Sequence, residues 1–149
     1  MRALIQRVLS ASVSVDGEKI SEISKGALIF LGVKVGDKKE DLDYLVKKIS
    51  GLRIFDDENS VMNLSILDLD LEILVVSQFT LYADTRKGNR PSYVRSEKRE
   101  NAYNTYMEFI KSLRNLGIKV SEGSFGADMK VSLVNDGPVT IIIDSEKIY

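Results

Sequence analysis

The chain has 149 residues, of which 44% are hydrophobic and 29% charged, and its formal net charge at pH 7 is −1. These values are typical of one soluble globular domain over residues 1–149, and they indicate no protein-wide nucleic-acid-binding surface. The chain contains no cysteine and no histidine, which excludes disulfides, Ser-His and Cys-His catalytic pairs and the usual zinc ligands. An enzyme with this sequence must therefore use other side chains, main-chain dipoles or groups of its own substrate.

The sequence offers no obvious membrane or export segment. No apolar run approaches the roughly 18 residues needed to span a bilayer, and the longest, ALIFLGV at 27–33, has the length of a strand. The N-terminal stretch MRALIQRVLS lacks a long apolar region followed by a small-residue cleavage site. We therefore expect a cytoplasmic protein with no membrane partner.

The first half of the chain predicts strands and one helix. Three segments have the composition and turn signals of strands: 2–8, 12–23 and 27–33. The last of these lacks polar alternation, which indicates a central strand. A helix is expected to begin after Asp37, a candidate N-cap, and to end at Gly51.

The second half predicts more strands, a polar loop and a second helix. Strands are expected at 52–56, 71–78, 118–125 and 130–144. The helix should begin after Ser96 and end at Gly117, with one face formed by Ala102, Tyr106, Phe109, Ile110, Leu113 and Leu116. The whole pattern predicts a compact α+β domain whose largely antiparallel or mixed sheet curls towards a barrel, covered by two main helices.

Charges are unevenly distributed along the chain. The segment 86–99 holds six bases and one acid, and a basic loop of this kind can dock phosphates locally, although the charge pattern alone favours a solvated loop and helix start. The segment 56–72 holds six acids and no base. Its carboxylates have the chemistry of Mg²⁺ ligands, but a solvated face is the simpler interpretation, and we predict no metal site.

Three short motifs have residue types suited to a binding site. In SQFTL, strand alternation would put Ser77 and Phe79 on one face and Gln78 and Thr80 on the other. These polar groups are candidates for a site, or they satisfy nearby backbone groups while Phe79 packs in the core. In NDGPVT, a proline between two strand segments requires an edge, a bulge or a turn, and the general statistics of X-Pro bonds favour a trans peptide.

The third motif is SFGADM, and a basic segment lies upstream of it. Ala127 and Met129 are candidates for lining a pocket, although core packing would explain them equally well. The segment RKGNRPSYVR combines several cations with Tyr93, which suits a single-stranded phosphate backbone and a stacked base.

Together and in this order, these segments resemble the D-aminoacyl-tRNA deacylases, also described as D-tyrosyl-tRNA deacylases. The resemblance covers essentially the whole chain and includes QRV, LGV, LRIFDDE, MNLS, SQFTLYAD, KGNRPS, FGADM and NDGPVT. Ser60-Val61 replaces the Gly-Lys pair usual in the family, which is a local loop change.

The resemblance implies a cytoplasmic homodimer that proofreads aminoacyl-tRNA for translation. Such proteins hydrolyse the ester between a D-amino acid and the CCA end of tRNA, remove glycine from mischarged tRNA, and need no cofactor. Their site lies at the dimer interface, where SQFTL of one subunit meets a cis Gly-Pro pair of the other. A non-catalytic dimeric RNA-binding module is the alternative function.

The same resemblance assigns roles to particular residues. Main-chain N–H groups near Phe79 and Thr80 would stabilise an oxyanion, Phe79 would also help to place the terminal adenosine, and Ser77 and Gln78 would orient the substrate or hold the strand end rigid. Thr80 is also a candidate nucleophile, but without a base partner we prefer catalysis assisted by the 2′-hydroxyl of the substrate. Four cations are candidates for binding the CCA end: Arg86, Lys87, Arg90 and Arg95.

Chiral selection would come from the main chain of one short segment. Carbonyl groups of Gly137 and Pro138 would leave room for hydrogen where an L-amino acid places its Cβ. Glycine has no Cβ and would not be rejected. A Cβ at residue 137 would intrude on the site.

Overall fold

A computed structural model describes residues 1–148, and only the last residue of the expected 1–149 domain lies outside the described part. Six strands form the main sheet: β1 (Arg2–Val15), β2 (Glu18–Ile23), β3 (Gly26–Gly32), β6 (Glu72–Ser77), β7 (Lys119–Glu122) and β8 (Met129–Asp144). A separate hairpin is formed by β4 (Phe55–Asp56) and β5 (Met62–Leu64). The helices are α1 (Lys39–Ser50), a short 3-10 helix η1 (Phe79–Tyr82) and α2 (Arg99–Asn115).

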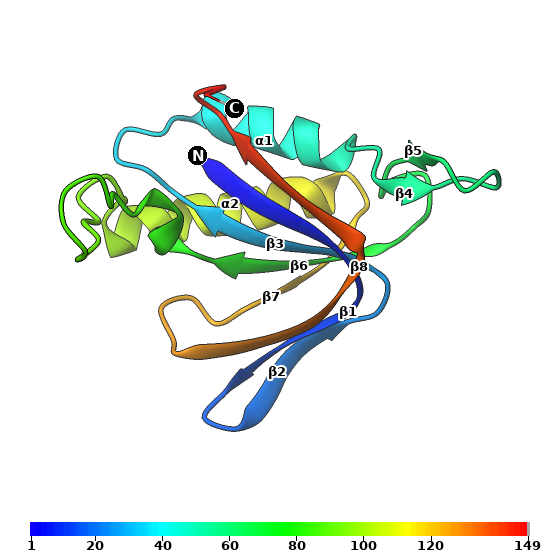
Figure 1. Ribbon diagram of the computed structural model, residues 1–149, viewed down its shortest axis with the longest axis horizontal. Helices are drawn as coiled ribbons and strands as arrows, with labels where there is room; N and C mark the ends of the chain where they lie inside the picture. The colour runs from blue at the N-terminus through cyan, green and yellow to red at the C-terminus, as the bar shows by residue number, and fades with distance from the viewer. Residues whose placement is uncertain (149) are drawn as a thin grey trace.

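The sheet is mixed and strongly curled, as expected. Its order is β2-β1-β3-β6-β7, with β8 paired to β1. The pairs β3–β6 and β6–β7 are parallel, and the remaining pairs of this sheet are antiparallel. Figure 1 shows β1 and β8 bending together through the middle of the molecule, and β2 comes near β6 and β7. This nearly closed arrangement confirms the barrel-like α+β fold.

Apolar residues gather in two clusters on opposite sides of the strands. The larger one joins β1, β3 and β6 to the apolar faces of α1 and α2, including Leu45, Phe109 and Leu113. The smaller one lies among the strands alone and includes Val13 and Leu74. Since α1 and α2 share one cluster, they cover the same part of the sheet (Figure 1). No helix in residues 1–148 is long and apolar enough to cross a membrane.

Several predicted boundaries were wrong for local physical reasons. The expected strand at 2–8 extends to residue 15 as one continuous β1, and only the last two residues of 52–56 are strand. Asp37 is not an N-cap, because its Oδ2 accepts the main-chain N–H of Lys34 at 2.6 Å and α1 begins two residues later. Ser96 is not an N-cap either, because its hydroxyl donates to the Phe79 carbonyl at 2.9 Å.

Candidate functional site

The end of β6 does not continue as a strand through SQFTL. The Gln78 N–H still donates to the Leu31 carbonyl at 2.8 Å, and the chain then winds into η1. The expected alternation of side chains beyond Ser77 was therefore wrong. Phe79 is 56% exposed rather than buried in the core.

Glycine at the end of β3 allows η1 to lie against the sheet. A Cβ at Gly32 would lie 3.1 Å from the Gln78 carbonyl oxygen and 3.2 Å from Leu81 Cβ. Arg2 Nη1 also donates to the Leu81 carbonyl at 2.7 Å. These contacts, with the bond from Ser96 to the Phe79 carbonyl, fix the position of η1.

Two main-chain N–H groups at the start of η1 have no partner within that helix. In a 3-10 helix each N–H bonds to the carbonyl three residues earlier, so the first residues are left without intrahelical acceptors. Here Leu81 N–H donates to Gln78 and Ala83 N–H to Thr80, while the N–H groups of Phe79 and Thr80 donate to no other group in residues 1–148. They are the two donors for which the sequence predicted an oxyanion role.

The Thr80 hydroxyl has an amide donor, not a base, as its neighbour. Gln78 Nε2 donates to Thr80 Oγ1, so the hydroxyl oxygen accepts a hydrogen bond. A threonine nucleophile needs a base that removes its proton, and no carboxylate or amine in the described residues bonds to this oxygen. The geometry therefore favours a positioning role for Thr80.

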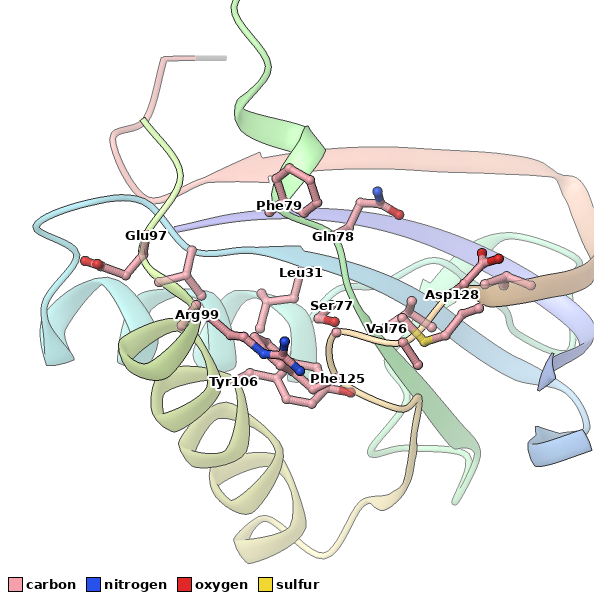
Figure 2. Close-up of a pocket in the computed structure, with 16 residues that line it drawn as sticks. Leu31, Val76, Ser77, Gln78, Phe79, Glu97, Arg99, Tyr106, Phe125 and Asp128 are labelled. Carbon is pink, nitrogen blue, oxygen red and sulfur yellow. The ribbon is translucent and has the colours of Figure 1, made fainter. Parts of the chain in front are cut away.

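A pocket of about 450 Å³ opens beside this strand end (Figure 2). Five of the residues selected from the sequence line it: Ser77, Gln78, Phe79, Ala127 and Met129. Other lining residues were missed as site residues: Glu97, Arg99, Ala102, Tyr106 and Phe125. Ala102 and Tyr106 were expected on the apolar core face of α2 because of their helical spacing. The sequence pattern does not distinguish residues that line a pocket from residues of the core, whereas the folded structure does.

The pocket has a rigid aromatic wall. Tyr106 and Phe125 pack with ring centroids 5.5 Å apart, and the buried Tyr106 hydroxyl donates to the Val75 carbonyl at 2.8 Å. Burial raises the pKa of the Tyr106 phenol, so this hydroxyl stays protonated and continues to donate. Figure 2 shows Arg99 grouped with these two rings. Such a wall suits a flat aromatic ligand group.

The NDGPVT motif forms a bulge in β8. Gln6 pairs with Thr140 and Val8 pairs with Asn135, so Arg7 alone faces the four residues 136–139. The Gly137–Pro138 peptide bond is cis, as the resemblance implied. The bulge interpretation of the internal proline is thus confirmed.

Two side chains hold this bulge in place. Asn135 Nδ2 donates to the Arg7 carbonyl at 3.0 Å and to the Val139 carbonyl at 2.9 Å. Arg7, only 6% exposed, donates to the carbonyls of Ile54 at 2.7 Å and Asp136 at 3.2 Å. Arg7 also forms an ion pair with the Asp136 carboxylate at 3.1 Å. The bulge is therefore anchored to the segment that leads into β4.

Within one chain, the bulge and the pocket lie at different places on the sheet. Arg7 pairs with Ala27, which pairs with Ile73 near the start of β6, whereas Ser77 lies four residues further on (77 − 73). Four residues of strand correspond to about 13 Å. Figure 1 accordingly shows the segment that follows β6 and the sharp bend of β8 at opposite ends of the sheet, left and right, and neither Gly137 nor Pro138 lines the pocket.

Replacing Arg7 by methionine should destabilise the fold strongly. The variant leaves the Ile54 carbonyl without its donor and removes the contacts to Asp136, so we expect the free energy of unfolding to fall by about 2–4 kcal/mol. Arg53→Met is a matched control, because within residues 1–148 exposed Arg53 donates only to Asn63, and its loss should cost about 0.5–1 kcal/mol. Urea unfolding followed by circular dichroism measures both, and equal small losses would contradict an anchoring role for Arg7.

The four cations selected from the sequence do not line the pocket. Arg86 bonds to Asp84 through Nε at 2.9 Å and Nη2 at 2.6 Å, and these hydrogen bonds hold the pKa of Asp84 well below its usual range. Arg95 pairs with Glu146 at 3.1 Å. Lys87 and Arg90 lie exposed on the same loop. Arg99, four residues beyond the last of the selected cations, lines the pocket instead.

The acidic segment forms turns. Asp57 accepts the N–H groups of Asn59 and Val61, and these bonds lower its pKa. Asp68 accepts from the Ser65 hydroxyl and N–H, with the same effect on its pKa. Within residues 1–148 no three acids gather as a metal site.

Comparison with known proteins gives one consistent result. The family profile described as D-Tyr-tRNA(Tyr) deacylase matches residues 4–144. A D-aminoacyl-tRNA deacylase of Thermosipho africanus is 55% identical over 149 residues, covering 100% of both chains. One from Clostridioides difficile is 52% identical, also over 100% of both chains.

Solved structures share the fold. The chain described as "c-Myc DNA Unwinding Element Binding Protein" superposes with a TM-score of 0.91 at 41% identity, covering 97% of this chain and 98% of the other. A second, from "a probable eukaryotic D-amino acid tRNA deacylase", superposes with a TM-score of 0.81 at 16% identity, covering 96% and 98%. At that identity, the second match supports the fold alone.

Proposed function

The chain belongs to the D-Tyr-tRNA(Tyr) deacylase family, and we propose that it hydrolyses the ester linking a D-amino acid to the 3′ end of tRNA. Full-length identity to D-aminoacyl-tRNA deacylases supports the reaction class. The observation that best supports the location of the active site is the pair of free N–H groups of Phe79 and Thr80 beside a pocket with an aromatic wall. Such an enzyme would act where aminoacyl-tRNA is used, so we propose a cytoplasmic location.

The pocket is the proposed site of the terminal adenosine. A volume of about 450 Å³ is sufficient for a nucleoside, and Phe125, Ala102 and Met129 give an apolar and aromatic lining for a purine. Ser77, Gln78 and Phe79 lie along the same pocket. The ester attached to the ribose would thereby lie next to η1.

Catalysis would combine main-chain electrostatics with a group of the substrate. The N–H groups of Phe79 and Thr80 would stabilise the oxyanion that forms when water adds to the ester carbonyl. The ribose 2′-hydroxyl lies next to the esterified 3′ oxygen and would position the water and transfer its proton. Gln78 already donates to Thr80, which supports a structural role for that hydroxyl.

Chiral selection would use Gly137 and Pro138 of a second subunit. Within one chain these residues lie outside the pocket, so a second copy is required to bring them to it. Both are exposed, together with apolar residues of the same strand, Val134 at 51% and Ile142 at 37%. Exposed apolar residues beside this segment fit a face that a second copy of the chain covers. Main-chain carbonyls would then exclude the Cβ of an L-amino acid and admit D-amino acids and glycine.

The proposed activity predicts a clear difference between three substrates. We expect release of the amino acid from D-tyrosyl-tRNA and glycyl-tRNA, and no release from L-tyrosyl-tRNA, because only the L-isomer places Cβ against the carbonyls. Thin-layer chromatography of radiolabelled 3′ ends measures the remaining ester over time. Binding of all three without hydrolysis would identify an RNA-binding module instead. Rapid hydrolysis of the L-ester would contradict main-chain chiral selection.

A further inference from the structure

A second cleft of about 400 Å³ adjoins the pocket on its outer side. Arg99, Glu100, Tyr103 and Phe125 line it. Arg99 and Phe125 also line the first pocket, so occupants of the two sites would lie on either side of the same two side chains. The two sites are therefore neighbours that meet at Arg99 and Phe125.

Arg99 lies between the two sites with its guanidinium free. Gly126, at φ +76, provides the space, because a Cβ there would lie 2.8 Å from Arg99 Nη2. No acid pairs with Arg99 in the part of the chain that the structure describes. A guanidinium at the boundary of two adjoining nucleotide-sized spaces is suited to the phosphate that joins two nucleotides.

Tyr103 gives the second cleft an aromatic surface. Its ring meets Phe125 edge-on, with centroids 5.3 Å apart and planes at 71°, and the side chain remains 46% exposed. Phe125 is itself held by Tyr106. Aromatic side chains that are fixed in this way bind the bases of single-stranded nucleic acids by stacking.

Glu100 adds a hydrogen-bond acceptor to the same cleft. It forms no ion pair within residues 1–148. A carboxylate accepts well from the exocyclic amino group of cytosine, whereas uracil has a carbonyl acceptor at that position. The combination of Tyr103, Glu100 and Arg99 thus matches a cytidine followed by a phosphate.

We propose that this cleft binds the nucleotide that precedes the terminal adenosine, with its base on Tyr103, its amino group on Glu100 and the connecting phosphate on Arg99. The inference rests on the proposed deacylase function, which places adenosine in the adjoining pocket. The tRNA 3′ end would then be held by α2, and not chiefly by the loop that contains Arg86.

Two substrates distinguish the contribution of this cleft from that of the first pocket. D-Tyrosyl-tRNA occupies both sites, whereas 3′-O-(D-tyrosyl)adenosine has no preceding nucleotide. We expect Tyr103→Ala to lower kcat/KM for the tRNA by about fivefold or more, from loss of stacking, with no comparable loss for the adenosine ester. Tyr103→Phe should restore most of the lost activity, because it keeps the ring. Lys111→Ala, an exposed change further along α2, is the control.

The identity of the penultimate base of the tRNA tests whether Glu100 acts as a hydrogen-bond acceptor. Wild-type protein should prefer a tRNA ending in CCA over one with uridine in the penultimate position by about fivefold, and Glu100→Ala should remove this preference. The inference would be overturned if Tyr103→Ala lowered kcat/KM equally for the tRNA and the adenosine ester, or for neither. It would also be overturned if the wild-type protein showed no preference for cytidine. A wild-type protein that hydrolyses neither substrate would instead overturn the proposed function.

Discussion

D-Tyrosyl-tRNA that ends in 2′-deoxyadenosine is expected to be hydrolysed about 10²–10⁴ times more slowly than the natural substrate. The reason is the absence of histidine from the chain and of any base bonded to Thr80 in the described residues. The substrate hydroxyl is then the group left to move a proton near the ester. Single-turnover rates at saturating enzyme measure the chemical step directly.

Thr80→Ala removes the protein hydroxyl instead of the substrate hydroxyl and completes the comparison. Removing the hydroxyl takes one acceptor from Gln78, so we expect at most about a tenfold loss of rate, equivalent to one ordinary hydrogen bond. For the 2′-deoxy ester, competition against the natural substrate shows whether this ester still binds the protein. If Thr80→Ala abolished turnover and Thr80→Ser restored it while the 2′-deoxy ester reacted normally, threonine would be the nucleophile.

Gly137→Ala is expected to lower kcat/KM for D-tyrosyl-tRNA by about 10²-fold, because the bulge must shift to admit the new methyl group. The added Cβ would lie 2.8 Å from Arg7 Nη2 and 2.9 Å from Val139 Cγ2. The residue also has φ +117, a conformation that alanine rarely adopts. Arg7 cannot move away freely, since the Ile54 carbonyl holds it. Steady-state kinetics with D- and L-tyrosyl-tRNA measure both rate and selectivity.

A mixed dimer tests whether the bulge acts on its own subunit or on its partner. Ala102→Trp fills the pocket of one subunit, since Ala102 lines it, and should be inactive as a homodimer. When this subunit is paired with a Gly137→Ala subunit, one of the two composite sites has an intact pocket and an intact bulge. Co-expression with two affinity tags isolates the mixed dimer. Recovery of activity supports a shared site, whereas a mixed dimer as inactive as both parents contradicts it.

The sequence predicted the fold well because periodic segments determine which faces are buried. The apolar run at 27–33 became the central strand β3, and the α2 stripe packs through Tyr106, Phe109, Ile110 and Leu113. Helix starts were predicted poorly, because Asp37 accepts a hydrogen bond from the Met1 N-terminal ammonium and Ser96 donates to the Phe79 carbonyl instead of capping. Such distant partners leave no local pattern.

The site was predicted only in part for a similar reason. Short motifs marked Ser77, Gln78, Phe79, Ala127 and Met129, all of which line the pocket. Arg99 and Phe125 belong to separate segments whose approach depends on how β7, β8 and α2 pack. The cations of the loop were chosen by local charge density, which does not reveal that Arg86 is already bonded to Asp84.

In the proposed mechanism, the position of Arg7 would connect catalytic accuracy to a remote part of the fold. Its guanidinium joins the bulge to the Ile54 carbonyl and to Asp56 at 3.3 Å, so the hairpin of β4 and β5 helps to set where Gly137 lies. In a dimer with shared sites, damage to this hairpin in one protomer would produce stereochemical errors at the neighbouring catalytic centre. Proteolytic cleavage or ligand binding near residues 57–61 of one protomer would thus change the stereochemical selectivity of the site shared with the other protomer, without contact with any nucleotide.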